Sequence, residues 1–243
     1  MGDTQIGAVL VAAGRGTRMQ SGAPKQFQDL AGRKLVLYSL HTMWSSPLVD
    51  YIVVVVPEGW ESAMRALCAE ERMDPQHVRV VVGGRTRQDS VRRGLGALPA
   101  CSHVIVHDAA RPFVSQAQIA AVLGAARVHG AATTALPVTD TLMRVRQTPG
   151  GAAQVEPVDR QGVWAVQTPQ AFERRLLDHA HAHAHAHTSG SQATDDGSLV
   201  LALGRRLEVV AGSWWNIKIT SPEDFGRAHA ILAAGVCEKD GEP

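Results

Sequence analysis

Glycines and cations near the start of the chain have the types and spacing of a phosphate-binding loop. A short apolar run over residues 6–13 leads into Gly14-Arg15-Gly16-Thr17, and Arg18 and Lys25 follow. Glycines let the backbone approach a ligand and present its N–H groups, which phosphate oxygens bind when positive charge lies nearby. The sequence therefore predicts a site for nucleotide phosphates, and the alternative is an ordinary strand and turn with solvated arginines.

Two well-known glycine loops do not fit this stretch. The dinucleotide-binding fingerprint needs a third glycine where this chain has Met19. The P-loop needs four residues between its glycines and then Gly-Lys-Ser/Thr, a pattern that is absent here. The remaining pattern, Leu10-x-Ala-Ala-Gly-x-Gly-x-Arg-Met followed by Pro24-Lys25, resembles the signature of the nucleotidyltransferases.

Two charged residues further along the chain are also candidates for chemistry. Asp108 directly follows the apolar stretch 103–107, and a carboxylate at a strand end can hold Mg²⁺ or a ribose hydroxyl. The alternative is a structural aspartate that caps the next turn and pairs with Arg111. Lys218 lies between Ile217 and Ile219, so on a strand its side chain would point opposite to both. It then needs an anion, unless it is a surface lysine on an edge strand.

The elements that position these residues alternate between strands and helices. The patterns predict strands over residues 6–13, 51–56, 78–82, 103–107, 131–137, 163–166 and 207–210. They predict helices over residues 34–44, 58–72, 91–98, 115–128, 172–187, 194–202 and 222–234. This alternation indicates an α/β fold with a mostly parallel twisted sheet, helices on both faces and one domain over 1–243. The loops at 12–18, 83–90 and 107–112 all follow strands, so we expect them to open onto one crevice.

Residues 138–162 break this alternation. The stretch is polar and contains a Gly150-Gly151 turn between two short strand-like runs, which predicts a projecting β-hairpin arm. Isolated hairpins are marginal in water, so an arm that packs on a second subunit and forms a homodimer is favoured over a mobile surface loop.

Composition limits the class of protein. The chain has 243 residues, 45% of them hydrophobic, and a formal net charge of +1, which argues against a nucleic-acid binder. The most apolar run, residues 51–56, is too short to span a bilayer, so no membrane segment is expected. The three cysteines are far apart and odd in number, which is typical of free thiols in a reducing cytoplasm.

A tract of alternating histidines and alanines covers His179 to His187. Such a tract can bind metal adventitiously, but no carboxylate or cysteine shares its spacing. We interpret it as a solvated, Ala-rich extension of a helix.

Eight motifs along the chain, in this order, resemble the 2-C-methyl-D-erythritol 4-phosphate cytidylyltransferases of the non-mevalonate isoprenoid pathway. The resemblance runs from Ile6 to about Ala233, and the first motif alone is shared by many nucleotidyltransferases. The motifs are Val11-Ala-Ala-Gly-Arg-Gly-Thr-Arg-Met19 with Pro24-Lys25-Gln26, Gly83-Gly84 with Arg87 and Ser90-Val91, His107-Asp-Ala-Ala-Arg-Pro112, Pro137 with Asp140-Thr141, Val158-Asp-Arg160, Thr168-Pro-Gln170, Thr194-Asp195, and Asn216-Ile-Lys-Ile-Thr220.

The resemblance implies a Rossmann-like nucleotidyltransferase fold, a homodimer and a reaction. CTP and a polyol phosphate, methylerythritol phosphate, would give CDP-methylerythritol and pyrophosphate by in-line attack on the α-phosphate, with Mg²⁺ or another divalent cation. The implied catalytic residues are Arg18, Lys25, Arg160 and Lys218. The implied nucleotide-binding residues are Ala12, Ala13, Gly14, Gly16, Gly84, Ser90, Asp108 and Ala109, with Asp108 also at the metal. The implied acceptor-binding residues are Thr141, Arg160, Thr168 and Arg111.

One departure and two other interpretations remain open. Some relatives carry an acidic residue where this chain has Arg85, which leaves side-chain contacts to the base undetermined. A cytidylyltransferase for ribitol 5-phosphate shares the fold and several motifs. A non-catalytic nucleotide-binding protein on this scaffold is expected to lack Arg18, Lys25 or Lys218, and all three are present.

Overall fold

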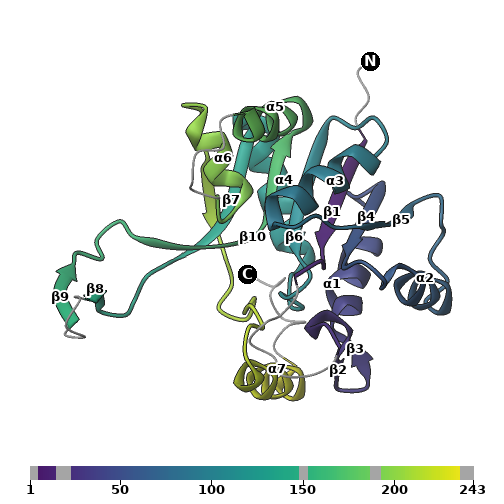
Figure 1. Ribbon diagram of the computed structural model, residues 1–243, viewed down its shortest axis with the longest axis horizontal. Coiled ribbons are helices and arrows are strands. Elements are labelled where there is room, and N and C mark those ends of the chain that lie inside the picture. The colour runs from purple at the N-terminus through teal and green to yellow at the C-terminus, as the bar shows by residue number, and fades with distance from the viewer. Residues whose placement is uncertain (1–4, 15–22, 148–152, 187–192, 236–243) are drawn as a thin grey trace.

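The computed structural model describes residues 5–14, 23–147, 153–186 and 193–235. Its centre is a seven-stranded sheet in the order β11-β7-β10-β6-β1-β4-β5 (Figure 1). Neighbouring strands are parallel except at β10, which runs antiparallel to both β6 and β7. The strands are β1 (Ile6–Val11), β4 (Tyr51–Val56), β5 (Val78–Val82), β6 (His103–Asp108), β7 (Ala131–Pro137), β10 (Trp164–Glu173) and β11 (Glu208–Ala211). The predicted mostly parallel α/β sheet is confirmed.

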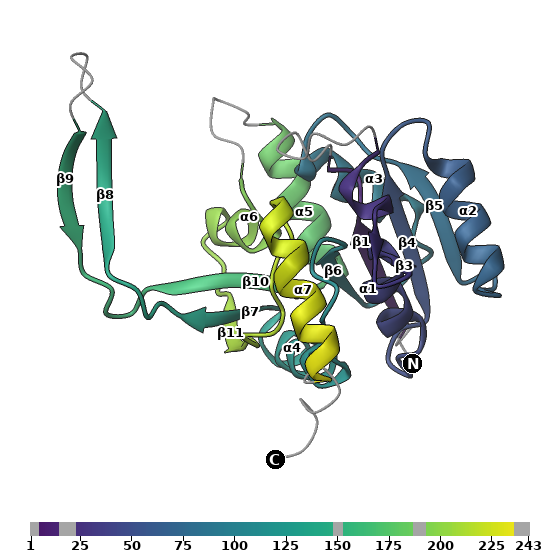
Figure 2. The ribbon, with the colours of Figure 1, turned by 90° about the horizontal axis from the view of Figure 1, so that it is seen from below.

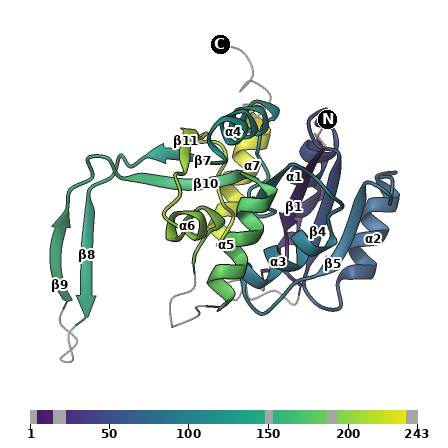
Figure 3. The same ribbon diagram turned by 90° about the horizontal axis from the view of Figure 1, so that it is seen from above.

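Helices cover both faces of this sheet, as predicted. Because side chains alternate along a strand, Ala8 and Leu10 of β1 belong to one apolar cluster and Val9 and Val11 to the other. The first cluster includes residues of α1 (Leu35–Trp44), α2 (Glu61–Glu70) and α4 (Gln116–His129). The second includes residues of α3 (Arg87–Ala97), α5 (Arg174–Ala186) and α6 (Asp196–Ala202), which lie along one side of the sheet (Figure 3).

A smaller third cluster joins the two ends of the chain. The last helix, α7 (Pro222–Ala234), packs Ala228 and Ile231 against Leu30 and Leu35. Leu30 belongs to a two-stranded ribbon of β2 (Asp29–Leu30) and β3 (Arg33–Lys34), which follows a 3₁₀ turn η1 (Lys25–Phe27). This packing holds α7 against the β2–β3 ribbon and the start of α1.

The predicted hairpin arm is present and projects from the body of the protein (Figures 1 and 2). It consists of β8 (Leu142–Gln147) and β9 (Ala153–Val158), and the predicted Gly150-Gly151 turn lies outside the described residues. Met143 pairs with Pro157 and Val145 with Val155 on one face, and all four are exposed. The opposite face carries an ion pair of 2.9 Å between Arg144 and Glu156. The arm therefore presents an apolar face with no partner in the described part of its own chain.

Two predicted boundaries around residue 170 are wrong. The sequence predicted a strand ending at residue 166 and a helix from residue 172, but β10 continues to Glu173 and α5 begins at Arg174. The register of β10 shifts between Val166 and Gln170, which accommodates Pro169, and the strand then resumes between β6 and β7. Proline and glutamine are typical of a loop, and here burial in the middle of the sheet outweighs that preference.

Residues 212–220 form no strand, but Ile219 is fully buried and the exposed Lys218 reaches the carboxylate of Asp108. One further interpretation is wrong. The histidine tract is not all solvated, because His181 is only 2% exposed. Among the described residues, no helix is long and apolar enough to cross a membrane.

Candidate active site

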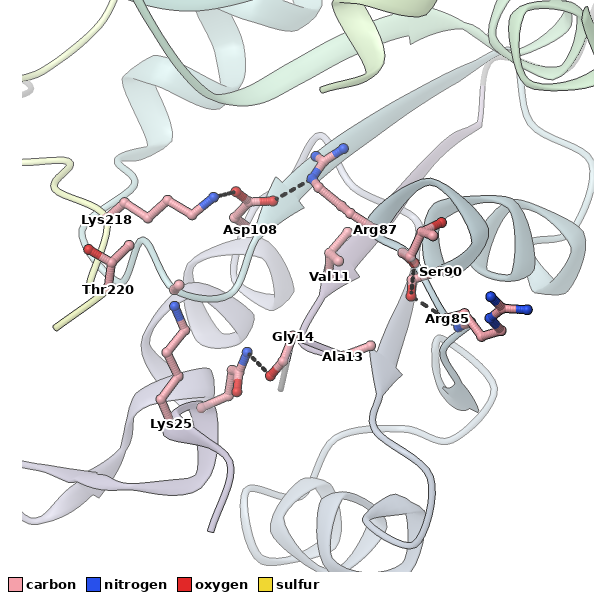
Figure 4. Close-up of a pocket in the computed structure, with 14 residues that line it drawn as sticks. Val11, Ala13, Gly14, Lys25, Arg85, Arg87, Ser90, Asp108, Lys218 and Thr220 are labelled. Carbon is pink, nitrogen blue, oxygen red and sulfur yellow. Dashed lines mark hydrogen bonds and ion pairs between the residues drawn. The ribbon is translucent and has the colours of Figure 1, made fainter. Parts of the chain in front are cut away.

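The loops after β1, β5 and β6 open onto one cavity of about 390 Å³, as their positions predicted (Figure 4). Lys25 and the 217–220 segment close the other side of the cavity. The described lining residues are Val11, Ala13, Gly14, Lys25, Gln26, Gly84, Arg85, Thr86, Arg87, Ser90, Asp108, Ala110, Lys218 and Thr220. Four of these are cations and one is a carboxylate, so the cavity suits a polyanion.

Close packing of small residues shapes the floor of the cavity. A Cβ at Gly83 would lie 2.3 Å from the Cβ of Ala13 and 2.8 Å from Oγ of Ser90. The Ser90 hydroxyl accepts from the N–H of Gly84 at 3.0 Å and donates to the carbonyl of Thr86 at 2.9 Å, which fixes this turn. Thr86 in turn caps α3 by accepting from the Asp89 N–H at 3.0 Å. The turn and the helix start are thus one hydrogen-bonded unit, and Arg87 occupies the first position of the helix.

Asp108 lies at the charge centre of the cavity. Its Oδ2 accepts from Nζ of Lys218 at 2.6 Å and its Oδ1 from Nε of Arg87 at 3.1 Å (Figure 4). Burial alone would raise the pKa of Asp108, but the charges of Arg87 and then Lys218 hold that pKa well below its ordinary value. Burial alone would lower the pKa of Arg87, whereas the carboxylates of Asp196 and then Asp108 keep it above its ordinary value. Asp108 and Arg87 are therefore both ionised near neutral pH.

A buried network behind Asp108 was not predicted from the sequence. The N–H of Asp108 donates to Oγ1 of Thr168 at 3.1 Å, and that hydroxyl lies 3.0 Å from Nδ1 of His107. His107 Nε2 is 3.0 Å from the carbonyl of Arg111, so Nε2 carries the proton and Nδ1 accepts from the hydroxyl. Burial lowers the pKa of His107 to about 4, which keeps the ring neutral. The His107-Asp108 dipeptide was the available signal, but its spacing alone did not reveal this role.

Hydrogen bonds to backbone carbonyls attach the segment before α7 to the site. Nζ of Lys25 donates to the carbonyl of Ile219 at 2.7 Å, and the N–H of Ile219 donates to the carbonyl of Ala110 at 2.8 Å. Asn216 is fully buried and donates to the carbonyl of Thr168 at 2.8 Å. Gln26 donates to the carbonyl of Gly14 at 3.1 Å, which joins the Pro24-Lys25-Gln26 motif to the glycine loop.

A second cavity of about 280 Å³ adjoins the first and shares Arg87, Asp108 and Lys218 with it. Arg111 and Thr168 line this second cavity, together with Thr194 and Asp195 from the start of α6. Nη1 of Arg111 donates to the carbonyl of Asn216 at 2.8 Å, which orients its guanidinium. The shared residues therefore separate two spaces, each of which contains cations.

The predicted site residues fall into five groups. Ala13, Gly14, Lys25, Gly84, Ser90, Asp108 and Lys218 line the first cavity, and Arg111 and Thr168 line the second. Ala12 and Ala109 are fully buried and line neither cavity; their N–H groups donate to carbonyls of Val55 and Val11. Thr141 and Arg160 lie exposed at the arm, where Arg160 donates to the carbonyl of Thr139. Gly16 and Arg18 lie outside the described residues.

Arg85, at the position where this chain departs from some relatives, is exposed at the edge of the first cavity. Its guanidinium points away from Asp108 and Lys218 (Figure 4). The long side chain therefore leaves the charge centre of the cavity open.

The donor chemistry at Asp108 fits a divalent cation that arrives with phosphates. Within the described ranges, no three His, Cys, Asp or Glu side chains gather into a metal site. Mg²⁺ commonly takes one or two carboxylates when phosphate oxygens supply other ligands, and each oxygen of Asp108 keeps a lone pair beside its one bonded cation. The surrounding cations disfavour a bare metal ion, so an ion held here would need phosphate oxygens as further ligands.

Comparisons with known proteins agree with this geometry. Residues 6–234 match the sequence profile of a family described as 2-C-methyl-D-erythritol 4-phosphate cytidylyltransferase. A protein of that description from Pelotomaculum thermopropionicum is 44% identical over 232 residues, which cover 95% of each chain. A bifunctional enzyme IspD/IspF from Desulforudis audaxviator is 46% identical over 94% of this chain, and the chain spans 57% of that relative's length.

Solved structures give the same family. The crystal structure of 4-diphosphocytidyl-2C-methyl-D-erythritol synthase from Anaerococcus prevotii has a TM-score of 0.80 and 31% sequence identity, and the match covers 95% of this chain and 96% of that one. The profile match and these relatives extend over nearly all of the sequence, including the strands and loops that form both cavities. The chain therefore belongs to the 2-C-methyl-D-erythritol 4-phosphate cytidylyltransferase family of enzymes.

Proposed function

We propose that the protein transfers CMP from CTP to 2-C-methyl-D-erythritol 4-phosphate and releases pyrophosphate. The observation that carries this proposal is the pair of cavities that meet at Arg87, Asp108 and Lys218. A triphosphate in the first cavity and a phosphorylated acceptor in the second bring their reacting atoms together at these shared residues. An acceptor phosphate oxygen forms a bond to the α-phosphorus, and the bond from that phosphorus to the β-phosphate bridging oxygen breaks. The electron pair leaves with pyrophosphate.

The chain's own residues act mainly by charge and position. The nucleophile is already an anion, so no general base is needed, and the obstacle is the mutual repulsion of two polyanions. A charge pair at 4 Å is worth about 4 kcal/mol at an effective dielectric constant near 20. We propose that Lys218 contacts the α-phosphate and that Lys25 and Arg18 stabilise charge on the triphosphate. Because enzymes lower barriers by roughly 8–23 kcal/mol, in-line positioning must supply much of the remainder.

We propose Mg²⁺, or another divalent cation, as the cofactor of this reaction. Asp108 would hold it together with the nucleotide phosphates, and the ion would neutralise charge on the transferring group. Lys218 donates to Oδ2 of Asp108 at 2.6 Å, and its ammonium would have to turn from this oxygen to contact the α-phosphate. Chelation with EDTA should abolish pyrophosphate release, and added Mg²⁺ should restore it.

The acceptor contacts that we propose come from two copies of the chain. Arg111 and Thr168 line the second cavity, whereas Thr141 and Arg160 lie exposed at the arm. The arm residues reach an acceptor only if the arm lies against the cavity of another copy. The exposed face of Met143, Val145, Val155 and Pro157 supports a homodimer, because burying it removes apolar surface from water.

We also propose the cytoplasm as the compartment. Cys68 and Cys101 are both free thiols in this structure. Burial and then the charge of Glu71 raise the pKa of Cys68 to about 11, so this thiol stays protonated and unreactive. Such buried free thiols are typical of proteins in a reducing environment.

Pyrophosphate release from CTP tests the proposed activity. Methylerythritol 4-phosphate and ribitol 5-phosphate should be compared as acceptors under identical conditions. A preference for methylerythritol 4-phosphate in kcat/KM supports the proposal, and a preference for ribitol 5-phosphate supports the related cytidylyltransferase instead. CTP binding without turnover of either acceptor would refute both and favour a nucleotide-binding protein.

A further inference from the structure

One histidine of the alternating tract differs from its neighbours in burial and in contacts. His181 is 2% exposed, and its Nε2 lies 2.8 Å from Oδ1 of Asp196, which is itself 1% exposed. His179, the preceding histidine of the tract, is exposed. Nδ1 of His181 is buried and has no hydrogen-bond partner, so the ring acts through its Nε2 edge alone.

This contact begins a series of ionic contacts that ends in the active site. Nη1 of Arg87 donates to Oδ2 of Asp196 at 2.7 Å, and Nε of Arg87 donates to Oδ1 of Asp108 at 3.1 Å. Lys218 donates to Oδ2 of Asp108 at 2.6 Å. We call these five residues, from His181 through Asp196, Arg87 and Asp108 to Lys218, the charge chain. His181 lines neither of the two described cavities. Three successive contacts nevertheless connect it to Asp108 in the active site.

The geometry of Asp196 explains why the first member of the charge chain matters. Its backbone N–H donates to Oε1 of Gln170 at 3.2 Å, which fixes the residue at the start of α6. Its carboxylate gives one oxygen to His181 and the other to Arg87. Without the first contact, a buried oxygen loses its partner, and the carboxylate gains by rotating both oxygens toward the guanidinium. Arg87 would then turn its Nε away from Asp108.

Apolar packing holds α5 and α6 together independently of this contact. Leu177 and Ala180 of α5 belong to the same buried cluster as Leu199 and Val200 of α6. The two helices also lie side by side in the structure (Figure 3). A change confined to the His181 ring edge therefore alters the carboxylate more than the position of the helices.

We propose that His181 is a positioning residue for nucleotidyl transfer: it fixes the Asp196 carboxylate, which holds Arg87 in the orientation that sets Asp108 and Lys218 at the junction of the two cavities. This inference rests on the proposed function. It assigns a role to a histidine that lines neither of the two described cavities. It also predicts that the contact with Asp196, on the side away from the first cavity, orders the guanidinium of Arg87.

The test compares three single variants. His181→Ala removes the donor, and His181→Gln keeps an N–H donor at similar reach. His179→Ala removes an exposed histidine of the same tract and serves as the matched control. Thermal unfolding of all three verifies that they are folded before their kinetics are compared.

We expect kcat of His181→Ala to fall by about 10-fold or more, with the KM for CTP changed much less, as for other residues that orient a site from behind. His181→Gln should restore most of kcat, and His179→Ala should match the wild type. A His181→Ala enzyme with lowered thermal stability but unchanged kcat would overturn the proposal, because the contact would then be only structural.

A second measurement does not depend on turnover. The Nε–H signal of Arg87 in ¹⁵N NMR, assigned with Arg87→Lys, should be protected from exchange in the wild type and in His181→Gln but not in His181→Ala. If neither acceptor is turned over and the signal still behaves in this way, the proposed function fails and the positioning role stands. If the signal is equally protected in His181→Ala, the positioning role fails whatever the activity.

Discussion

The tight packing beneath the glycine loop gives a prediction for Gly83→Ala. The added Cβ would lie 2.3 Å from the Cβ of Ala13, whereas carbon atoms in contact are normally about 3.5–4.0 Å apart. Ala13 cannot move freely, because the preceding N–H of Ala12 donates to the carbonyl of Val55 at 2.7 Å. Overpacking of this kind costs about 1–3 kcal/mol of unfolding free energy. At about 2–4 °C per kcal/mol for a chain of this size, a cost of about 2 kcal/mol lowers Tm by about 4–8 °C.

Gly96→Ala is a matched control in the same stretch of chain. Gly96 lies in α3, and a Cβ built there meets no atom within 4 Å. Alanine is more favourable than glycine inside a helix by about 0.5–1 kcal/mol, so this variant should raise Tm by about 1–4 °C. The same glycine-to-alanine change is thus expected to lower Tm at position 83 and to raise it at position 96.

Differential scanning calorimetry and calorimetric titration with CTP measure both parts of this prediction. Moving Ala13 and Gly14 by about 1 Å should weaken CTP binding by about tenfold, or 1.4 kcal/mol, in Gly83→Ala but not in Gly96→Ala. A Gly83→Ala protein with Tm within about 1 °C of the wild type and with unchanged CTP affinity would refute the reasoning.

Three further predictions concern charge, pH and assembly. Lys25→Met should lower kcat/KM by about 100-fold or more through loss of a contact-range charge, and Lys34→Met, outside both cavities, should not. The folded pKa of His107, about 4, lies below its ordinary value of 6.5, so the folded state binds fewer protons between these pH values. The free energy of unfolding should therefore fall as pH drops from 6.5 toward 4. In urea unfolding, His107→Gln should lose less stability over this pH range than the wild type; an equal loss would mean that other groups cause it. Val145→Glu, on the apolar face of the arm, should convert a dimer to a monomer in analytical ultracentrifugation. Arg144→Gln, on the other face, should stay dimeric, and a wild-type monomer would contradict the proposed assembly.

Local pattern was sufficient for much of the fold and of the first cavity. The apolar runs that end at glycine or aspartate predicted β1 and β6. Because parallel strands end at the same edge of a sheet, Gly14 and Asp108 were expected to lie at one cavity, as they do. The continuation of β10 past residue 166 could not be predicted in this way. The preference of Pro169 for a loop is a local property, whereas burial between β6 and β7 depends on residues distant in sequence.

The charge chain was also beyond sequence reasoning. The alternating tract places His179 and His183 on one helical face and His181 and His185 on another, but it does not show which of these histidines is buried against an anion. Only the packing of α6 against α5 brings Asp196 to one of them. Lys218 was predicted to need an anion, and the structure supplies Asp108, a residue 110 positions away in sequence.

The bond from Lys25 to the carbonyl of Ile219 joins residues 194 positions apart, and this has a consequence for protein synthesis. Ribosomes add roughly 5–20 residues per second, and the strands near the N-terminus can begin to pair while synthesis continues. By that rate, the carbonyl that anchors Lys25 is made roughly 10–40 s after the chain is started. A nascent chain can thus have its first strands paired long before its cationic cavity is complete. The proposed ability to hold a triphosphate is then among the last properties that the growing chain acquires.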